Sequence, residues 1–245
     1  MRRESYRDRA LVIRTYDFGE ADRIIVLLTR HHGIVRGVAK GVRRSKSRFG
    51  SRLQSFVDNS VTLYPGRNLE TITEADTVAF YGSGIIDEYP RYTAACAALE
   101  SAERLAALDG DDDPWLFDHL TETLARMQET AYPSMVLDSF LLQAMAHAGW
   151  APSLFDCAQC GNPGPHHAFH PAVGGAACVT CRPPGSAEVA EEALHLMWLL
   201  AHSHWPAALD RADPELIDAA HRLTRAHLQW HLEQKVTSLA VMDQV

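Results

Sequence analysis

The sequence predicts an α+β protein of two parts: a small barrel of five strands, then an all-α helical domain that carries an inserted cysteine module. Three observations predict this class. Branched apolar residues fill short runs in the first eighty positions, apolar residues recur at helical spacing from about position 85, and four of the five cysteines lie within 155–184. The predicted boundaries are 1–80 for the barrel, 81–245 for the helical domain and about 155–184 for the insert.

The first eighty residues contain five runs that are rich in branched apolar residues. We expect strands at 10–16, 23–29, 33–39, 60–64 and 69–73. Turn-forming residues at 65–68 separate the last two runs. Five strands with no long helical pattern between them are typical of a closed barrel. Gly33, Gly37 and Gly41 recur every four residues, and we expect them to permit bends or bulges within strands at barrel corners.

The helical domain is predicted from spacing and capping residues. We expect helices at 92–108, from 113 onward, and at 136–149. Asp113 and Asp213 are each followed by proline, the pattern of an N-cap before the first helical residue. Ser186 is the expected cap of a further helix. The acidic run 109–113 lacks the spaced oxygen ligands and distal glutamate of a calcium loop, so we expect a solvated connection there.

Composition places the chain among ordinary globular proteins. It has 245 residues, of which 47% are hydrophobic and 22% charged. The N-terminus shows no apolar segment of a signal peptide, and the longest apolar stretch, 193–201, is about half a bilayer span. We therefore expect a cytoplasmic protein with no membrane partner.

The net charge of −8 is divided unevenly along the chain. Residues 1–54 hold 14 of the 23 Lys and Arg but only 5 of the 31 Asp and Glu, a net charge of +9. The remaining residues carry a net charge of −17. The basic end should attract a polyanion, and the acidic remainder should repel one.

Two C-x2-C pairs separated by 17 residues are the most specific chemical signal in the sequence. Each pair can place two thiolates on one turn, and two such turns make a tetrahedral set that suits Zn²⁺. The insert is rich in Gly and Pro and poor in apolar residues, so it needs a cross-link to fold. The sequence predicts one structural Zn²⁺ held by Cys157, Cys160, Cys178 and Cys181.

Other interpretations of these cysteines are less favoured. Two disulfides are uncommon without a secretory signal, and a redox C-x-x-C needs no second pair. A catalytic zinc keeps an open position, and a deaminase needs H-x-E upstream of P-C-x-x-C. The histidines between the pairs are alternative ligands: His166, His167 and His170. Cys96 stands alone on an apolar helix face, where we expect a core residue.

The segment 36–52 contains seven cations and no acid. Small barrels bind single strands in a basic groove with aromatic stacking, whereas a basic run alone is often a solvated loop. The predicted backbone-binding residues are Arg36, Lys40, Arg43, Arg44, Lys46, Arg48 and Arg52. The candidate stacking residues are Tyr16, Phe18, Phe49 and Phe56, each of which is alternatively a core residue.

Catalytic signatures are missing from the sequence. It contains no phosphate-loop motif, no H-E-x-x-H and no G-x-S-x-G. We therefore predict no catalytic residues and a protein that is not an enzyme.

Together, these motifs resemble those of the RecO family of bacterial recombination mediators. The resemblance rests on LVIR at 11–14, GEADR at 19–23, LLTR at 27–30, HG at 32–33, AKGVRRSKSR at 39–48, LYPG at 63–66 with Leu69, FHPAVGG at 169–175 and the two cysteine pairs. It is specific over the first eighty residues and the insert, whereas the helices match in placement only.

The resemblance implies an OB-fold barrel, a helical domain and a zinc module. It further implies binding of single- and double-stranded DNA, annealing of complementary strands, and action with RecR to load RecA onto DNA coated by single-stranded-DNA-binding protein, in the cytoplasm and at the nucleoid. The alternative is an RNA- or transcription-associated OB-fold and zinc-ribbon module without annealing activity. The acidic tail of single-stranded-DNA-binding protein would need an apolar pocket edged by cations, for which the helical candidates are Arg91, Arg104, Arg126, Arg222 and Arg225.

Overall fold

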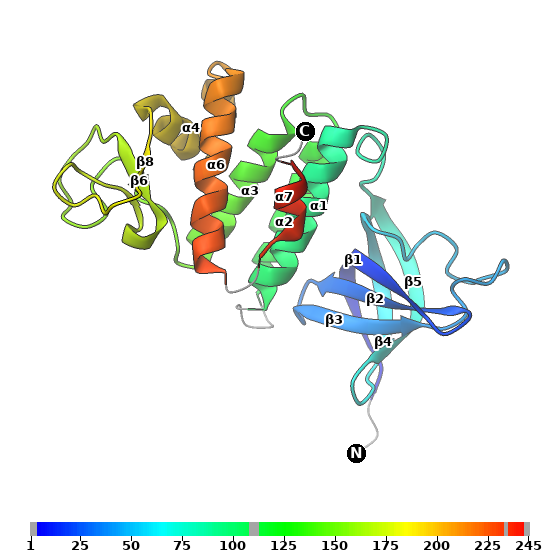
Figure 1. Ribbon diagram of the computed structural model, residues 1–245. Coiled ribbons are helices and arrows are strands. Elements are labelled where there is room, and N and C mark those ends of the chain that lie inside the picture. The colour runs from blue at the N-terminus through cyan, green and yellow to red at the C-terminus, as the bar shows by residue number, and fades with distance from the viewer. Residues whose placement is uncertain (1–3, 108–112, 233–234, 243–245) are drawn as a thin grey trace. The chain divides into compact units, whose positions relative to one another are not determined.

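The computed structural model describes residues 4–107, 113–232 and 235–242 (Figure 1). Residues 108–112, which include most of the acidic run considered for calcium, lie outside the described residues. The N-terminal part is a closed barrel of five strands in the order β1-β2-β3-β5-β4. The strands are β1 (Tyr6–Phe18), β2 (Asp22–Thr29), β3 (Ile34–Ala39), β4 (Val57–Tyr64) and β5 (Glu70–Phe80).

Alternating apolar residues of the strands fill the barrel. The buried barrel core includes Ala10, Val12, Ile25, Leu27, Val61, Leu63 and Ile72. Neighbouring strands pair antiparallel, except that β3 and β5 pair parallel to close the barrel. The result is a five-stranded Greek-key barrel of the OB type. The fold class predicted from the sequence, a barrel followed by helices with a cysteine cluster in their insert, is confirmed.

The three regularly spaced glycines do not all lie within strands. Only Gly37 belongs to β3; Gly33 and Gly41 flank that strand, so the expectation of a strand position is wrong for these two. A Cβ on Gly37 would lie 2.7 Å from Ile72 Cγ1 on β5, so the absent side chain lets the two closing strands approach. The bulge of β1 lies instead between Val12 and Arg14.

The remainder of the chain is mainly helical. The helices are α1 (Tyr89–Ala106), α2 (Trp115–Met127), α3 (Pro133–His147), α4 (Glu191–Ala201), α5 (Trp205–Leu209), α6 (Pro214–His231) and α7 (Thr237–Met242). Between α3 and α4 lie the short strands β6 (Ala168–His170), β7 (Gly175–Ala176) and β8 (Ala187–Glu188), with a 3-10 turn η1 (Pro171–Val173). Among the described residues, no helix is long and apolar enough to cross a membrane.

Of the three residues predicted to cap helices, only some do so. Asp213 caps α6, because its Oδ1 accepts from the backbone N–H groups of Glu215 and Leu216 at 3.1 and 3.2 Å. Helix α2 begins at Trp115 with Pro114 at the cap position, and Asp113 Oδ1, one residue earlier than a standard cap, accepts from the N–H of Trp115 at 2.8 Å. Ser186 caps no helix, contrary to the prediction: its hydroxyl donates to the Pro183 carbonyl at 2.7 Å, and β8 intervenes before α4 begins.

The chain divides into two compact units. The barrel unit contains β1 to β5 with α2 and α1, apart from residues 96–98, and the helical unit contains α3 to α7 with the cysteine insert. Polar contacts join the helices of the barrel unit to the barrel. Arg14 on β1 forms an ion pair with Glu103 on α1, and Arg30 donates to both carboxylate oxygens of Asp118 on α2 at 2.8 Å. The barrel therefore packs with two helices in one unit.

Candidate metal centre and nucleic-acid interface

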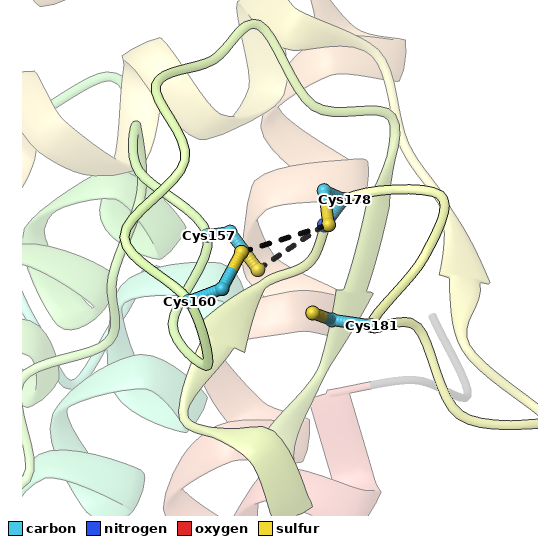
Figure 2. Close-up of side chains that lie close together, drawn as sticks. All are labelled: Cys157, Cys160, Cys178 and Cys181. Atoms are coloured by element: carbon cyan, nitrogen blue, oxygen red, sulfur yellow. Dashed lines mark hydrogen bonds between the residues drawn. The ribbon is translucent and has the colours of Figure 1, made fainter.

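The four predicted cysteines come together at one point in the insert (Figure 2). Their Sγ atoms all lie within 4.8 Å of one another, and those of Cys160 and Cys178 are 3.9 Å apart. Cys157 is buried, Cys160 is exposed, and the other two are half-buried. Two chain segments separated by 17 residues in sequence therefore present their thiols to a common centre.

Backbone hydrogen bonds build the two turns that carry the thiols. The N–H of Gly161 donates to the Cys157 carbonyl at 2.8 Å, and the N–H of Cys181 donates to the Cys178 carbonyl at 3.1 Å. Gly161 has φ +68°, which glycine adopts without the steric cost that a Cβ would add. The ladder of β6 and β7 pairs Phe169 with Ala176, and the N–H of Ala158 in the first turn donates to the Ala176 carbonyl at 2.8 Å.

The electrostatics of the cluster favour a cation. The N–H of Cys178 donates to Cys157 Sγ at 3.4 Å, which is the main reason that the pKa of Cys157 falls to about 6. In contrast, hydrogen bonds from Cys181 to Cys178 and Cys160 raise the pKa of Cys181 to about 12. Four thiols this close cannot all lose their protons unless a positive ion offsets the repulsion. The donor set fits a metal that prefers four sulfur ligands.

Two of the three predicted alternative ligands have partners elsewhere, and the third, His167, is exposed and outside the cluster. His166 is buried, with Nε2 2.9 Å from the Asn162 carbonyl oxygen, and His170 Nδ1 accepts from the N–H of Ala172 at 3.1 Å. Within the described part of the chain, the four cysteines are the only His, Cys, Asp or Glu group close enough to hold a metal. Cys96 lies on α1, half-buried and away from this group.

The seven predicted backbone-binding residues are all exposed. Arg36 lies on β3, and the other six lie on the segment 40–56 between β3 and β4, which we call the basic loop. Two apolar side chains of this loop, Phe49 and Leu53, enter the barrel core and are each 1% exposed. The loop backbone is thereby held against the barrel while its cations point to solvent.

Hydrogen bonds hold both ends of the basic loop. Near its start, the N–H of Gly41 donates to Asp22 Oδ1 at 2.7 Å, and the N–H of Arg43 donates to the Ala21 carbonyl at 2.9 Å. Near its end, the side-chain Nδ2 of Asn59 donates to the Arg52 carbonyl at 2.9 Å. The loop is therefore attached to the turn between β1 and β2.

The cations differ in their partners. Arg43 pairs with Asp17 of β1, with 3.4 Å between Nη2 and Oδ2, a partner from outside the segment considered in the sequence. The Arg48 guanidinium lies 4.8 Å from the centre of the Phe49 ring, and Arg52 donates to the Arg48 carbonyl. Among the described residues, six of the seven cations have no acidic partner: Arg36, Lys40, Arg44, Lys46, Arg48 and Arg52.

The candidate stacking residues divide into two pairs. Phe49 and Phe56 are 1% and 2% exposed, so they belong to the core and have no ring face open for a base. Tyr16 and Phe18 are 48% and 47% exposed. Spacing in the sequence did not distinguish the pairs, because burial of the loop aromatics depends on the fold of the loop over the barrel.

The helical unit contains an apolar cavity of about 270 Å³ between α3, α4 and the segment 151–156. Its lining includes Leu142, Ala146, Phe155, Trp198 and His202. None of the five arginines predicted to edge a tail-binding pocket is among its lining residues.

A closed OB-type barrel with an exposed basic loop is typical of nucleic-acid-binding proteins, and the four-thiol cluster in the helical part is typical of a metal site. Two family models match the chain. The model described as "Recombination protein O N terminal" matches residues 1–81, and the model described as "Recombination protein O C terminal" matches residues 87–240. The chain belongs to the RecO family. This membership supports a role as a recombination mediator in DNA repair.

Proposed function

We propose that the chain binds single- and double-stranded DNA through Arg36 and the cations of the basic loop. The observation that carries the proposal is a set of seven exposed cations, six of them without an acidic partner in the described residues, on a backbone held against an OB-type barrel. Phosphate contacts release counterions from DNA, so they supply affinity that does not depend on sequence. We propose no catalytic residue.

The test is a triple variant of the full chain, Arg43→Ala, Arg44→Ala and Lys46→Ala. If each single-strand contact contributes ~0.7 to the log–log salt slope, removal of three should flatten the slope by about 2. Affinity should fall alike for all DNA sequences. A matched control removes two arginines and one lysine from exposed positions of the helical unit: Arg182→Ala, Arg211→Ala and Lys235→Ala. Unchanged affinity and slope in the first variant would contradict the proposal.

The same cations support strand annealing, because two polyanionic strands must be brought together against their mutual repulsion. The triple variant should therefore anneal complementary DNA more slowly than the control variant. A single-stranded RNA competitor of the same sequence tests the alternative of an RNA- or transcription-associated module. Tighter binding to RNA, with no annealing of DNA, would favour that alternative.

The partners proposed for this function are RecR, the C-terminal tail of single-stranded-DNA-binding protein and, indirectly, RecA. Family membership supports these partners. A pull-down with purified RecR and with single-stranded-DNA-binding protein lacking or retaining its tail tests both direct contacts. Retention of the tail-deleted protein as strongly as the intact one would exclude tail recognition.

We further propose that the four cysteines hold one structural Zn²⁺. The mutual proximity of four sulfur donors supports this ion, because tetrahedral sulfur sites suit zinc. When bound, the ion would supply a cross-link between the two turns and charge compensation for the thiolates. Four protein ligands leave no open position for substrate, which favours a structural role.

A further inference from the structure

The register of the first three strands places two exposed aromatic residues and a predicted phosphate-binding cation on one face of the sheet. Arg14 of β1 lies opposite Val26 of β2, which lies opposite Arg36 of β3. In the next row on the same face, Tyr16 lies opposite Ile24 and Ile24 opposite Val38. Because side chains two residues apart share a face, Phe18 follows Tyr16 on this side of β1.

This face is uncovered at the end of β1. Tyr16 and Phe18 are 48% and 47% exposed, whereas Val38, two strands away in the row of Tyr16, is 8% exposed. Pairing of β1 with β4 ends at Leu11, so in the described barrel residues 14–18 pair with β2 alone. The two rings therefore stand above a small apolar surface near a free strand edge.

Tyr16 has its ring oriented by a fixed cation. The Arg14 guanidinium lies 5.8 Å from the centre of the Tyr16 ring, and Arg14 is itself held by its ion pair with Glu103 on α1. A cation over an aromatic ring is attracted to the ring face. With nearly half of its surface still exposed, the ring keeps area available for a flat partner.

Cations border this aromatic surface. Strands in a sheet are about 4.8 Å apart, so Arg36 on β3 lies roughly 10 Å from β1 across the sheet. The basic loop follows β3, and its backbone is hydrogen-bonded to the turn that follows Phe18, through Arg43 and Ala21. A ligand with flat apolar groups and a regularly charged anionic backbone matches this combination.

We propose that Tyr16 and Phe18 form a stacking platform for the unpaired bases of single-stranded DNA, whose phosphates contact Arg36 and the basic loop. The inference rests on the proposed DNA binding and adds that this surface selects single-stranded over duplex DNA. In a duplex the faces of the bases are already stacked on one another, so only a single strand can place its bases on the rings.

The test compares the full chain with a Tyr16→Ala, Phe18→Ala double variant on single-stranded and duplex DNA of the same sequence. Loss of one stacked base corresponds to roughly a five- to hundredfold weaker affinity. We expect a loss of that size for the single strand, little change for the duplex, and an unchanged salt slope because no cation is removed. Tyr64→Ala is the matched control, since Tyr64 is 46% exposed and follows Leu63, which lies opposite Tyr6 at the other end of β1 from Tyr16.

Two further measurements keep the test independent of folding. The ring-exchanging variant Tyr16→Phe, Phe18→Tyr should retain single-strand affinity, and 5-iodouracil in a bound single strand should cross-link to one of the two wild-type rings on irradiation. Equal losses on single-stranded and duplex DNA, or no loss on either, would overturn the platform. If the double variant loses more affinity for single-stranded RNA than for single-stranded DNA, the assignment to DNA would be wrong. If the cation triple variant loses DNA binding but the aromatic variant does not, the platform alone is wrong.

Discussion

Asp17 on β1 forms an ion pair with Arg43 of the basic loop, with 3.4 Å between Oδ2 and Nη2, and its Oδ1 accepts a hydrogen bond from Arg23 at 2.9 Å. The hydrogen bond from Arg23, together with the charge of Arg43, holds the pKa of Asp17 below its ordinary value. The carboxylate therefore stays charged at neutral pH and competes with DNA phosphate for two guanidinium groups.

Replacement of this carboxylate should strengthen DNA binding. In Asp17→Asn, Arg43 and Arg23 lose their anionic partner and become free for phosphate. We expect tighter binding because Asp17 no longer competes with phosphate for Arg43, and a log–log salt slope that is steeper by about 0.7 from the new single-strand contact of Arg23. The measurement is a titration of labelled single-stranded DNA over a range of salt concentrations.

Glu20→Gln is the control for the Asp17 variant. It lies in the same turn region, is exposed and makes the same change in net charge, and no ion pair of Glu20 occurs in the described residues. If both variants tighten binding equally, the gain comes from the overall field of the protein, and Asp17 exerts no specific competition.

The metal site predicts a definite stoichiometry. Elemental analysis of protein purified under reducing, chelator-free conditions should find about one zinc per chain. Cys157→Ser should lose most of this zinc and lower the thermal stability of the helical unit, because one of four converging donors is removed. DNA binding should stay measurable, because the basic loop belongs to the other compact unit.

Cys96→Ser is the matched control for the metal prediction, since Cys96 lies on α1 outside the cluster. It should keep the full zinc content. Wild-type protein that contains no metal, or a different metal in the same amount, would contradict the zinc assignment.

His227 on α6 should make the helical unit sensitive to acid. It is 1% exposed, its Nε2 lies 2.9 Å from the Trp150 carbonyl oxygen, and burial lowers its pKa to about 4. The unfolded chain takes up this proton near pH 6.5 and the folded chain does not, so stability is complete above pH 6.5 and falls as the pH drops towards 4. The loss attributable to His227 is about 2 kcal/mol at pH 5.

Urea unfolding at pH 7 and pH 5, followed by tryptophan fluorescence, measures this loss. Four of the five tryptophans lie in the helical unit, so the signal reports mainly on it. His227→Gln keeps a donor for the Trp150 carbonyl but cannot be protonated, and it should lose about 2 kcal/mol less than wild type between the two pH values. His167→Gln, at an exposed position, should follow the wild type. If the wild type and His227→Gln lose the same free energy of unfolding between pH 7 and pH 5, the acid sensitivity does not come from His227.

Features that depend on neighbouring residues could be predicted from the sequence alone. All five strands appear where branched apolar runs predicted them, although β1, β4 and β5 extend further. Asp213 caps α6 because its side chain reaches N–H groups two and three residues ahead. The C-x2-C pairs indicated a four-thiol cluster because each pair spans a single turn. In each case the interacting groups are close in sequence, or the spacing itself encodes the geometry.

Features that depend on long-range packing required the tertiary structure. Phe49 and Tyr16 are equivalent as candidate stacking residues in the sequence, yet the fold of the basic loop buries one in the barrel and strand pairing leaves the other exposed. The pairing of Asp17 with Arg43 joins residues 26 positions apart, and strand register alone brings Tyr16 and Arg36 to one face. The physical reason is that side-chain pattern specifies which face of a strand is apolar, whereas strand register and loop closure determine which distant residues share it.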